Sequence, residues 1–259
     1  MNVPALILSN LAIGYTDGGF KHQIVDVINT QLYSGELVSL VGLNGAGKST
    51  LLRTISAFQP PLSGEIEYCG CNTRVSDASQ LARHLAIVLT GREPIYNLSV
   101  REVVAMGRMP YTGFFGNNSA RDKRAVDEAM AFLGISSLAG RMIETLSDGE
   151  RQKAMIAKAV AQETPVILLD EPTAFLDFAS RVSLMQSLRT LAHDAGKAIL
   201  LSTHDLELAL RLSDRMWLMD KKQIHTGSVD ELSQSGALSS FIDNEGIRYD
   251  AHEHKIVIF

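Results

Sequence analysis

The sequence has little cysteine. Its 259 residues include two, Cys69 and Cys71, which lie on either side of Gly70. A structural metal site of the usual kind takes about four ligands, and no second cluster of ligand residues accompanies this pair. We therefore favour a structural role, with the two cysteines as strand residues flanking a turn at Gly70, over a metal-binding or redox role.

An excess of basic charge and a long apolar run are also missing. The formal net charge is −5, so the chain has no overall positive field to attract a phosphate backbone, and we expect no nucleic-acid partner. Residues 1–10 contain neither a basic region nor a small-residue cleavage site. No segment reaches the roughly 18 uninterrupted apolar residues that a membrane span requires. These absences predict a cytoplasmic chain that spans no membrane by itself.

The remaining composition is typical of a soluble α/β domain. Hydrophobic residues make up 46% and charged residues 20% of the chain, which excludes disordered and fibrous classes. Short apolar runs in residues 5–13 and 24–41 are interrupted by Asp17–Gly19 and Ser34–Gly35. This pattern predicts a small lobe of antiparallel strands at the beginning of the chain.

Further along, the pattern predicts helices inserted into a parallel sheet. Residues 97–162 contain three helix-like segments, at Arg101–Arg108, Ala120–Leu133 and Glu150–Gln162, with a Gly/Asn-rich stretch at 112–118. Val166–Leu169 and Ala198–Leu201 are apolar runs typical of strands buried on both faces. A helix is expected between these strands, over Ser180–Ala195. After residue 230 we expect a short helix and a terminal alternating segment.

A glycine-rich motif lies between a predicted strand, Leu37–Val41, and a predicted helix, Ser49–Phe58. It fits the phosphate-loop pattern G-x-x-x-x-G-K-[ST], and the strand–loop–helix context is the one this pattern requires. Its backbone N–H groups can surround phosphates, Lys48 can reach the outer phosphates, and the Ser49 hydroxyl can bind Mg²⁺. The candidate phosphate-binding residues here are Asn44, Gly45, Ala46, Gly47, Lys48, Ser49 and Thr50.

Two adjacent acids, Asp170 and Glu171, follow the buried strand Val166–Leu169. Ligands of open α/β sheets bind at the carboxyl ends of the strands, and acids beside so apolar a run need a partner such as a cation. Alone, the pair could be an ordinary strand end. Together with the phosphate loop, it predicts Asp170 as a Mg²⁺-site acid and Glu171 as the base that polarises the attacking water.

The segment Leu146–Gln152 reads LSDGERQ and precedes a predicted helix, with Ser147 and Glu150 at the spacing of a capping box. It also resembles the LSGGQ signature of ABC ATPases. This resemblance implies an α/β P-loop NTPase fold of the ABC ATPase type, with a small antiparallel β lobe and an inserted helical subdomain. The expected domains are residues 1–230, with the helical subdomain at about 91–162, and a C-terminal extension, 231–259, packed on it.

Further residues match the family pattern in order. The resemblance covers roughly residues 5–230 and implies that Tyr15 stacks on adenine, that Phe175–Asp177 is the D-loop and that His204 is the switch histidine. In this family two copies pack head to tail, so each ATP lies between the phosphate loop of one copy and the signature of the other. The nucleotide contacts implied outside the phosphate loop are Tyr15, Ser147, Asp148, Gly149, Glu150 and Asp177.

Two departures from the family pattern stand out. Asp148 and Glu150 occupy the positions of the usual signature Gly and Gln, and Thr90 follows the strand Leu85–Leu89 where a Gln is usual. In the family that Gln touches Mg²⁺ and senses the membrane domain. Thr90 keeps an oxygen on a shorter side chain, so we expect it to act at the metal through an intervening water.

The segment Val103–Tyr111 resembles the one found in ATPases of importers for ferric siderophores, haem and cobalamin. An ordinary helix end at Gly-Arg-Met-Pro is the alternative interpretation. The resemblance implies an ATPase on the cytoplasmic face of the cell membrane, whose partners are a second copy, permease subunits resting near Thr90–Pro110 and, indirectly, a substrate-binding protein. A soluble ABC ATPase of an assembly machine, such as iron–sulfur cluster biogenesis, is the alternative function.

Overall fold

The computed structural model describes residues 4–18, 20–72, 78–91, 95–112, 119–220 and 223–259. Within these residues, the central sheet has six strands in the order β10-β9-β3-β8-β7-β6. They are β3 (Leu37–Gly42), β6 (Leu85–Val88), β7 (Val166–Asp170), β8 (Ala198–Thr203), β9 (Arg215–Asp220) and β10 (Gln223–Gly227). All neighbouring pairs run parallel except β9 and β10. The prediction of parallel strands buried on both faces is confirmed, since every residue of β3, β7 and β8 is buried.

A second sheet is antiparallel and has the order β2-β1-β4-β5 among the described residues. Its strands are β1 (Pro4–Asp17), β2 (Phe20–Tyr33), β4 (Ser63–Tyr68) and β5 (Cys71–Asn72). The predicted antiparallel lobe is therefore present, but Leu37–Val41, the end of the range assigned to it, belongs to β3, which pairs with β8 and β9 of the central sheet. Cys69 is also not a strand residue: it lies in the turn with Gly70, and both have positive φ, 48° and 79°.

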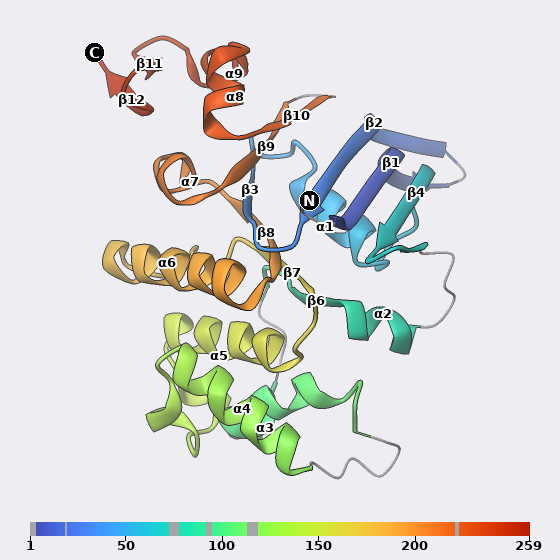
Figure 1. The fold of residues 1–259 in the computed structure, drawn as a ribbon, viewed down its shortest axis with the longest axis vertical. Coiled ribbons are helices and arrows are strands. Elements are labelled where there is room, and N and C mark those ends of the chain that lie inside the picture. Colours follow the sequence, from blue (N-terminus) through green and yellow to red (C-terminus); the bar gives the residue numbers. More distant parts are fainter. Residues whose placement is uncertain (1–3, 19, 73–77, 92–94, 113–118, 221–222) are drawn as a thin grey trace.

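Helices join and cover the two sheets (Figure 1). They are α1 (Lys48–Ile55), α2 (Ala78–His84), α3 (Val100–Ala105), α4 (Ala120–Phe132), α5 (Asp148–Ala161), α6 (Phe178–Ala195), α7 (Leu206–Leu212), α8 (Val229–Gln234) and α9 (Ala237–Ile242), with short 3₁₀ turns η1 (Met106–Arg108), η2 (Ser136–Leu138) and η3 (Ile143–Thr145). The predicted helices are present. The first ends three residues before the predicted Phe58, because Ala57 has a φ of 59° and the Phe58 amide donates back to the Arg53 carbonyl.

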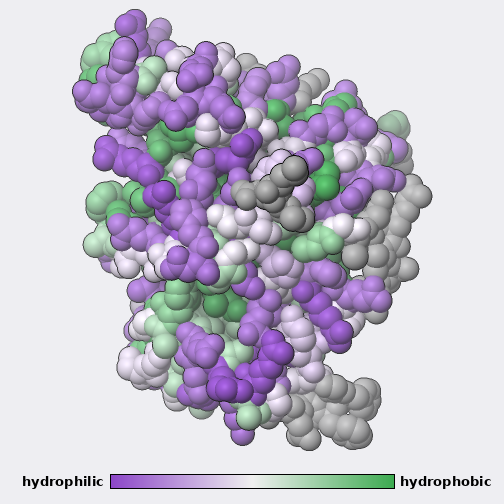
Figure 2. Space-filling view, viewed as in Figure 1, coloured by the Kyte–Doolittle hydropathy of each residue, from purple (hydrophilic) through white to green (hydrophobic). Residues whose placement is uncertain are grey.

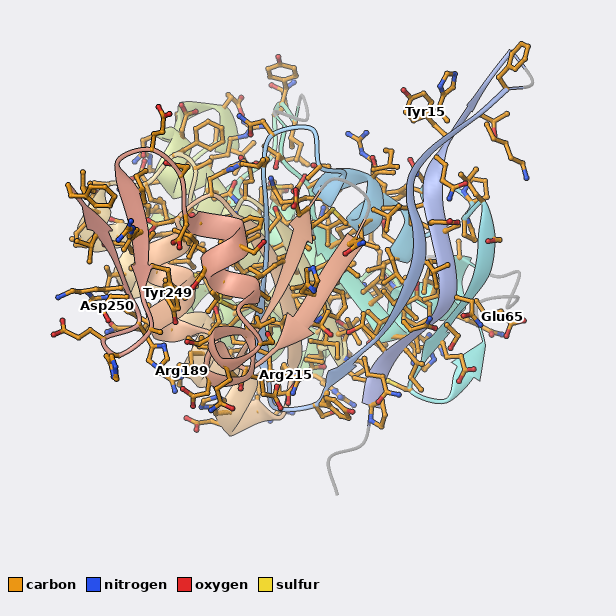
Figure 3. The ribbon with its side chains drawn as sticks, turned by 90° about the horizontal axis from the view of Figure 1, so that it is seen from above. Tyr15, Glu65, Arg189, Arg215, Tyr249 and Asp250 are labelled. Carbon is orange, nitrogen blue, oxygen red and sulfur yellow. The ribbon has the colours of Figure 1, made fainter. Side chains whose placement is uncertain are left out.

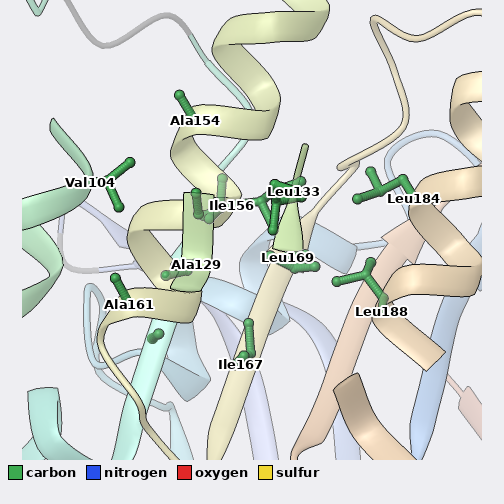
Figure 4. Close-up of a cluster of buried hydrophobic side chains, with 14 of the residues drawn as sticks. Val104, Ala129, Leu133, Ala154, Ile156, Ala161, Ile167, Leu169, Leu184 and Leu188 are labelled. Atoms are coloured by element: carbon green, nitrogen blue, oxygen red, sulfur yellow. The ribbon is translucent and has the colours of Figure 1, made fainter. Parts of the chain in front are cut away.

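Alternation along the buried strands divides the core between the two faces of the central sheet. Ile167 and Leu169 of β7 face helices α3 to α6 and contribute to one apolar cluster with Ile156 of α5 and Leu188 of α6 (Figure 4). Val166 and Leu168 point the other way, toward α1 and the antiparallel lobe. The phosphate-loop helix α1 and the helix α5 that follows the signature thus lie on opposite faces of one sheet.

The last segment forms a third apolar cluster. Leu232 of α8, Leu238 of α9 and Tyr249 of the hairpin β11 (Ile247–Asp250) and β12 (Lys255–Ile258) pack with Met216 and Leu218 of β9. Hydrophilic residues cover most of the face seen in Figure 2, with hydrophobic residues in separate groups. No helix within the described ranges is both long enough and apolar enough to cross a membrane.

Candidate functional site

The carboxyl ends of four neighbouring parallel strands bring the predicted site residues to one edge of the central sheet. In the register of the sheet, Val41 lies beside Thr203 and Asp170 lies beside Ser202. The phosphate loop follows β3, His204 follows β8, Glu171 follows β7, and Thr90 comes shortly after β6. Because the loop, the acids and His204 come from adjacent strands, they form one site.

The phosphate loop is shaped by glycines. Gly45 and Gly47 have φ values of 80° and 104°, in the left-handed region that favours glycine. A Cβ on Gly47 would lie 2.5 Å from Cγ2 of Ile24, so a larger residue there would also clash. Gly47 is the N-cap of α1 and has no side chain to cap the helix. The backbone N–H groups at this helix start therefore suit a phosphate.

Lys48 lies folded against its own loop. Its side chain is buried, and its Nζ donates hydrogen bonds to the Gly42 carbonyl at 2.8 Å and to the Leu43 carbonyl at 3.4 Å. Burial lowers the pKa of Lys48, and the nearby charges of Glu171 and Asp170 oppose that shift. The loop cation and the two acids are thus close enough to interact, as a shared phosphate and metal site requires.

The acid at the end of β7 is held by a hydroxyl from the neighbouring strand. Asp170 is 4% exposed, and its Oδ1 accepts a hydrogen bond of 2.6 Å from the Ser202 hydroxyl. The same hydroxyl oxygen accepts the Glu171 amide at 2.9 Å. Sequence reasoning did not assign Ser202 a role in the site. The available signal was a polar residue at the end of the apolar run Ala198–Leu201.

Glu171 and His204 contact each other directly. Glu171 has an unusual left-handed φ of 48°, and its Oε1 lies 2.7 Å from Nε2 of His204. Both side chains line a surface hollow, together with Thr203 at the end of β8, Asp205 at the start of α7 and Arg181 of α6. A carboxylate paired with an imidazole in an open hollow can take a proton from a water molecule and pass charge to its neighbour.

The oxygen atoms at this edge of the sheet suit Mg²⁺. They suit less well a metal whose ligands all come from the protein. The described residues contain no group of three or more His, Cys, Asp or Glu side chains that could hold a metal ion. Mg²⁺ usually takes one or two protein oxygens and completes its shell with phosphates and water. The buried Asp170 carboxylate and the Ser49 hydroxyl, which belongs to the first turn of α1, are oxygens of that kind.

Thr90 lies beside the acids, but its hydroxyl contacts the main chain. Its Oγ1 donates a 2.9 Å hydrogen bond to the carbonyl oxygen of Asp170. The expected water-mediated contact of Thr90 with the metal stays a prediction, because this hydrogen bond neither requires nor excludes it.

The signature residues are at the start of α5, where they cap the helix. Ser147 and Glu150 form the predicted capping box: the Glu150 amide donates to the Ser147 hydroxyl at 3.3 Å, and Glu150 Oε2 accepts from the Ser147 amide at 2.9 Å. The hydrogen bonds that the amide and the hydroxyl of Ser147 donate to the Glu150 carboxylate lower the pKa of Glu150. A Cβ on Gly149 would lie 3.0 Å from Leu176, so the signature and the D-loop are neighbours.

The D-loop residue Asp177 plays a similar local role. It is the N-cap of α6, and its carboxylate accepts hydrogen bonds of 2.9 Å from the amide and the hydroxyl of Ser180. These bonds lower the pKa of Asp177. The signature and D-loop helix starts lie on the sheet face opposite α1, so the structure does not bring them together with the phosphate loop within one chain.

Tyr15 stands apart from the sheet edge, on the β1–β2 ribbon (Figure 3). Its side chain is 55% exposed and stacks on His22, with ring centroids 5.1 Å apart and an interplanar angle of 20°. An exposed aromatic face supported from behind can accept a stacked base. The adenine-stacking role implied for Tyr15 stays a prediction.

The Gly-Arg-Met-Pro segment has an internal, structural role that sequence reasoning missed. Arg108 is 1% exposed and forms ion pairs of 2.9 Å with Asp122 and 2.8 Å with Glu163. Gly107 allows close packing, since a Cβ there would lie 2.2 Å from the Lys158 carbonyl oxygen. These contacts join η1 to α4 and α5. They give the motif a role in packing. This role does not indicate which substrate is transported.

A family model described as "ABC transporter" matches residues 25–174. An uncharacterized ABC transporter ATP-binding protein of Methanocaldococcus jannaschii is 38% identical over 93% of this chain and 82% of its own length. A cobalamin import ATP-binding protein of Halobacterium salinarum is 37% identical over 78% of this chain and 50% of its own length. An iron(3+)-hydroxamate import ATP-binding protein of Bacillus subtilis is 36% identical over 84% of this chain and 79% of its own length.

Solved structures show the same relationship. An inward-facing ABC transporter of metal-chelate type matches with a TM-score of 0.78 and 28% identity, over 92% of this chain and 89% of that one. A dimeric ATP-binding cassette in a post-hydrolysis state, bound to ADP and phosphate, matches with a TM-score of 0.76 and 27% identity, over 86% of this chain and 98% of that one.

Proposed function

This chain belongs to the ABC transporter family of ATP-hydrolysing subunits, and from that premise we propose that it drives import of a metal chelate through partner permease subunits. The cargo class is a ferric siderophore, haem or cobalamin. Support for it comes from the cobalamin and iron(3+)-hydroxamate importers among the relatives and from the metal-chelate transporter among the similar structures.

The observation that carries the ATP-hydrolysing role is the shared edge of β3, β8 and β7, where Lys48, Asp170 and Glu171 meet. We assign ATP to the loop from Asn44 to Thr50, with its adenine on Tyr15. Asp170 and Ser49 would hold Mg²⁺. Bound there, Mg²⁺ would supply positive charge to offset the negative charge that develops on the phosphates.

Glu171 is the residue we assign as general base. It takes a proton from the attacking water while that water's oxygen forms a bond to the γ-phosphorus and the bond to the leaving ADP oxygen breaks. His204 holds the Glu171 carboxylate through the 2.7 Å contact. The contact uses Oε1, so the other carboxylate oxygen, Oε2, is the proton acceptor in this proposal.

A complete site in this proposal needs two copies of the chain. Ser147, Asp148, Gly149 and Glu150, with Asp177, are assigned to the ATP held by the phosphate loop of the other copy. Two observations support this assignment: these residues lie across the sheet from α1, and a similar cassette is dimeric with ADP and phosphate bound.

The membrane partners would rest on the helical subdomain. We place that subdomain at about residues 91–162 within an ATPase domain of residues 1–230, followed by the extension 231–259. Met106 of η1 and Met109, which follows it, are 37% and 65% exposed and give this subdomain apolar surface for a permease. The chain would thus lie peripherally on the cytoplasmic face of the membrane and meet a substrate-binding protein only through the permease.

The decisive experiment is reconstitution of the chain in liposomes with the permease encoded beside it and the corresponding binding protein. We expect ATP-dependent uptake of one among a ferric siderophore, haem and cobalamin, and none with Lys48→Ala. Lys255→Ala, at a lysine of β12 outside both the site and the helical subdomain, is the matched control. A chain that hydrolyses ATP but neither binds that permease nor supports uptake would contradict import and favour an assembly role.

A further inference from the structure

We propose that Thr90 is a positioning residue for Glu171, which acts by fixing the peptide unit between Asp170 and Glu171. This inference rests on the proposed role of Glu171 as the base. It gives Thr90 a function different from the metal contact expected from the sequence.

Both polar groups of that one peptide unit bond to side-chain hydroxyls. Its carbonyl, on Asp170, accepts from Thr90 Oγ1 at 2.9 Å. Its N–H, on Glu171, donates to Ser202 Oγ at 2.9 Å. Thr90 follows β6 and Ser202 lies in β8, the two strands on either side of β7. The peptide is therefore held from the sides of both neighbouring strands, at the end of β7.

Fixing this peptide matters because of the backbone angle that follows it. Glu171 has a φ of 48°, which residues with a side chain adopt rarely and only where their surroundings impose it. The angle φ is the rotation that joins this peptide plane to the Glu171 Cα. A fixed plane together with a fixed φ sets the direction in which the carboxylate leaves the main chain, toward His204 in this structure.

The two hydroxyls differ in their surroundings, and this sets the size of the expected effect. Ser202 is fully buried and also donates to the Asp170 carboxylate, so its substitution would disturb the metal-site acid as well. Thr90 is exposed, and its hydroxyl bonds to the main chain. Water competes with such a bond, so its loss should have a modest effect that falls on Glu171.

The test compares Thr90→Val, which keeps the shape and removes the hydroxyl, with Thr90→Ser, which keeps the hydroxyl. In the full-length protein we expect Thr90→Val to lower kcat about three- to tenfold, the usual worth of one hydrogen bond. KM for ATP, the Mg²⁺ concentration for half-maximal activity and the equilibrium affinity for ATP with Mg²⁺ should stay unchanged. Thr90→Ser should remain within about twofold of wild type.

Each alternative gives a different result. If Thr90 contacts the metal, Thr90→Val raises the Mg²⁺ requirement and weakens Mg²⁺-dependent ATP binding. An unchanged kcat in Thr90→Val, or an equal loss in Thr90→Ser, would overturn the role of the hydroxyl. Thr90→Ala, which has no methyl group in place of the hydroxyl, must lower kcat as much as Thr90→Val does if the loss comes from the hydroxyl. Absence of ATP hydrolysis in the wild-type protein would instead overturn the proposed function.

Discussion

Two regions that we assign to ATP differ in how their polar groups are satisfied. At the sheet edge, Lys48, Asp170 and Ser202 are buried, and Asp170 and Ser202 are joined across neighbouring strands. At the starts of α5 and α6, Ser147 and Asp177 bond to groups three residues away in their own helices. The first region exists only once the sheet has assembled. The second is formed locally, and its residues remain exposed. Residues that complete the site of another copy must be exposed in this way.

Placing a large cation in the second region should have the largest effect. We expect Ser147→Arg to reduce hydrolysis to background, because it removes the serine from the partner's site and fills the space, while ATP binding to the isolated chain persists. The matched control is Ser228→Arg, which disrupts a capping box of the same kind at the start of α8. Steady-state ATPase and ATP binding distinguish the two. Loss of ATP binding in Ser147→Arg would contradict the separation of the regions.

The next effect concerns the base at the sheet edge. Glu171→Gln keeps the shape and removes proton acceptance, so hydrolysis should be at least about a hundredfold slower, within the range expected for a general base. ATP binding should persist, and the protein should accumulate as a closed dimer in ATP, measurable by size-exclusion chromatography. Turnover near that of wild type would exclude Glu171 as the base.

A smaller difference between the two regions is expected in the free energy of unfolding. Ser202→Ala leaves the Asp170 carboxylate and the Glu171 amide short of a buried partner, which should cost about 1–3 kcal/mol of unfolding free energy. Ser147→Ala removes one exposed helix cap, worth about 1 kcal/mol. Denaturant unfolding of both variants measures the difference. A greater loss in Ser147→Ala would contradict the distinction between buried and local hydrogen bonding.

This contrast also explains what the sequence could predict. Strands β3, β7 and β8 and the phosphate loop were predictable because each is encoded by a short contiguous pattern, and the capping box of Ser147 is equally local. The contacts of Thr90 and Ser202 with the Asp170–Glu171 peptide depend on the order of β6, β7 and β8, which come from distant parts of the chain.

The partners of Arg108 were unpredictable for the same reason. Asp122 and Glu163 are separated from it along the chain and come together only when α4 and α5 pack against η1. In the sequence, Arg108 was a motif residue that indicated a transported substrate. In the structure, it is a buried cation that joins three elements of the helical region.

The dependence of ATPase activity on protein concentration tests the composite site most directly. Activity per chain should fall as the wild-type protein is diluted through the range in which light scattering or sedimentation shows dimers separating, because a monomer lacks the signature residues of a partner. Activity per chain that stays constant where all of the protein is monomeric would contradict a site shared between two copies.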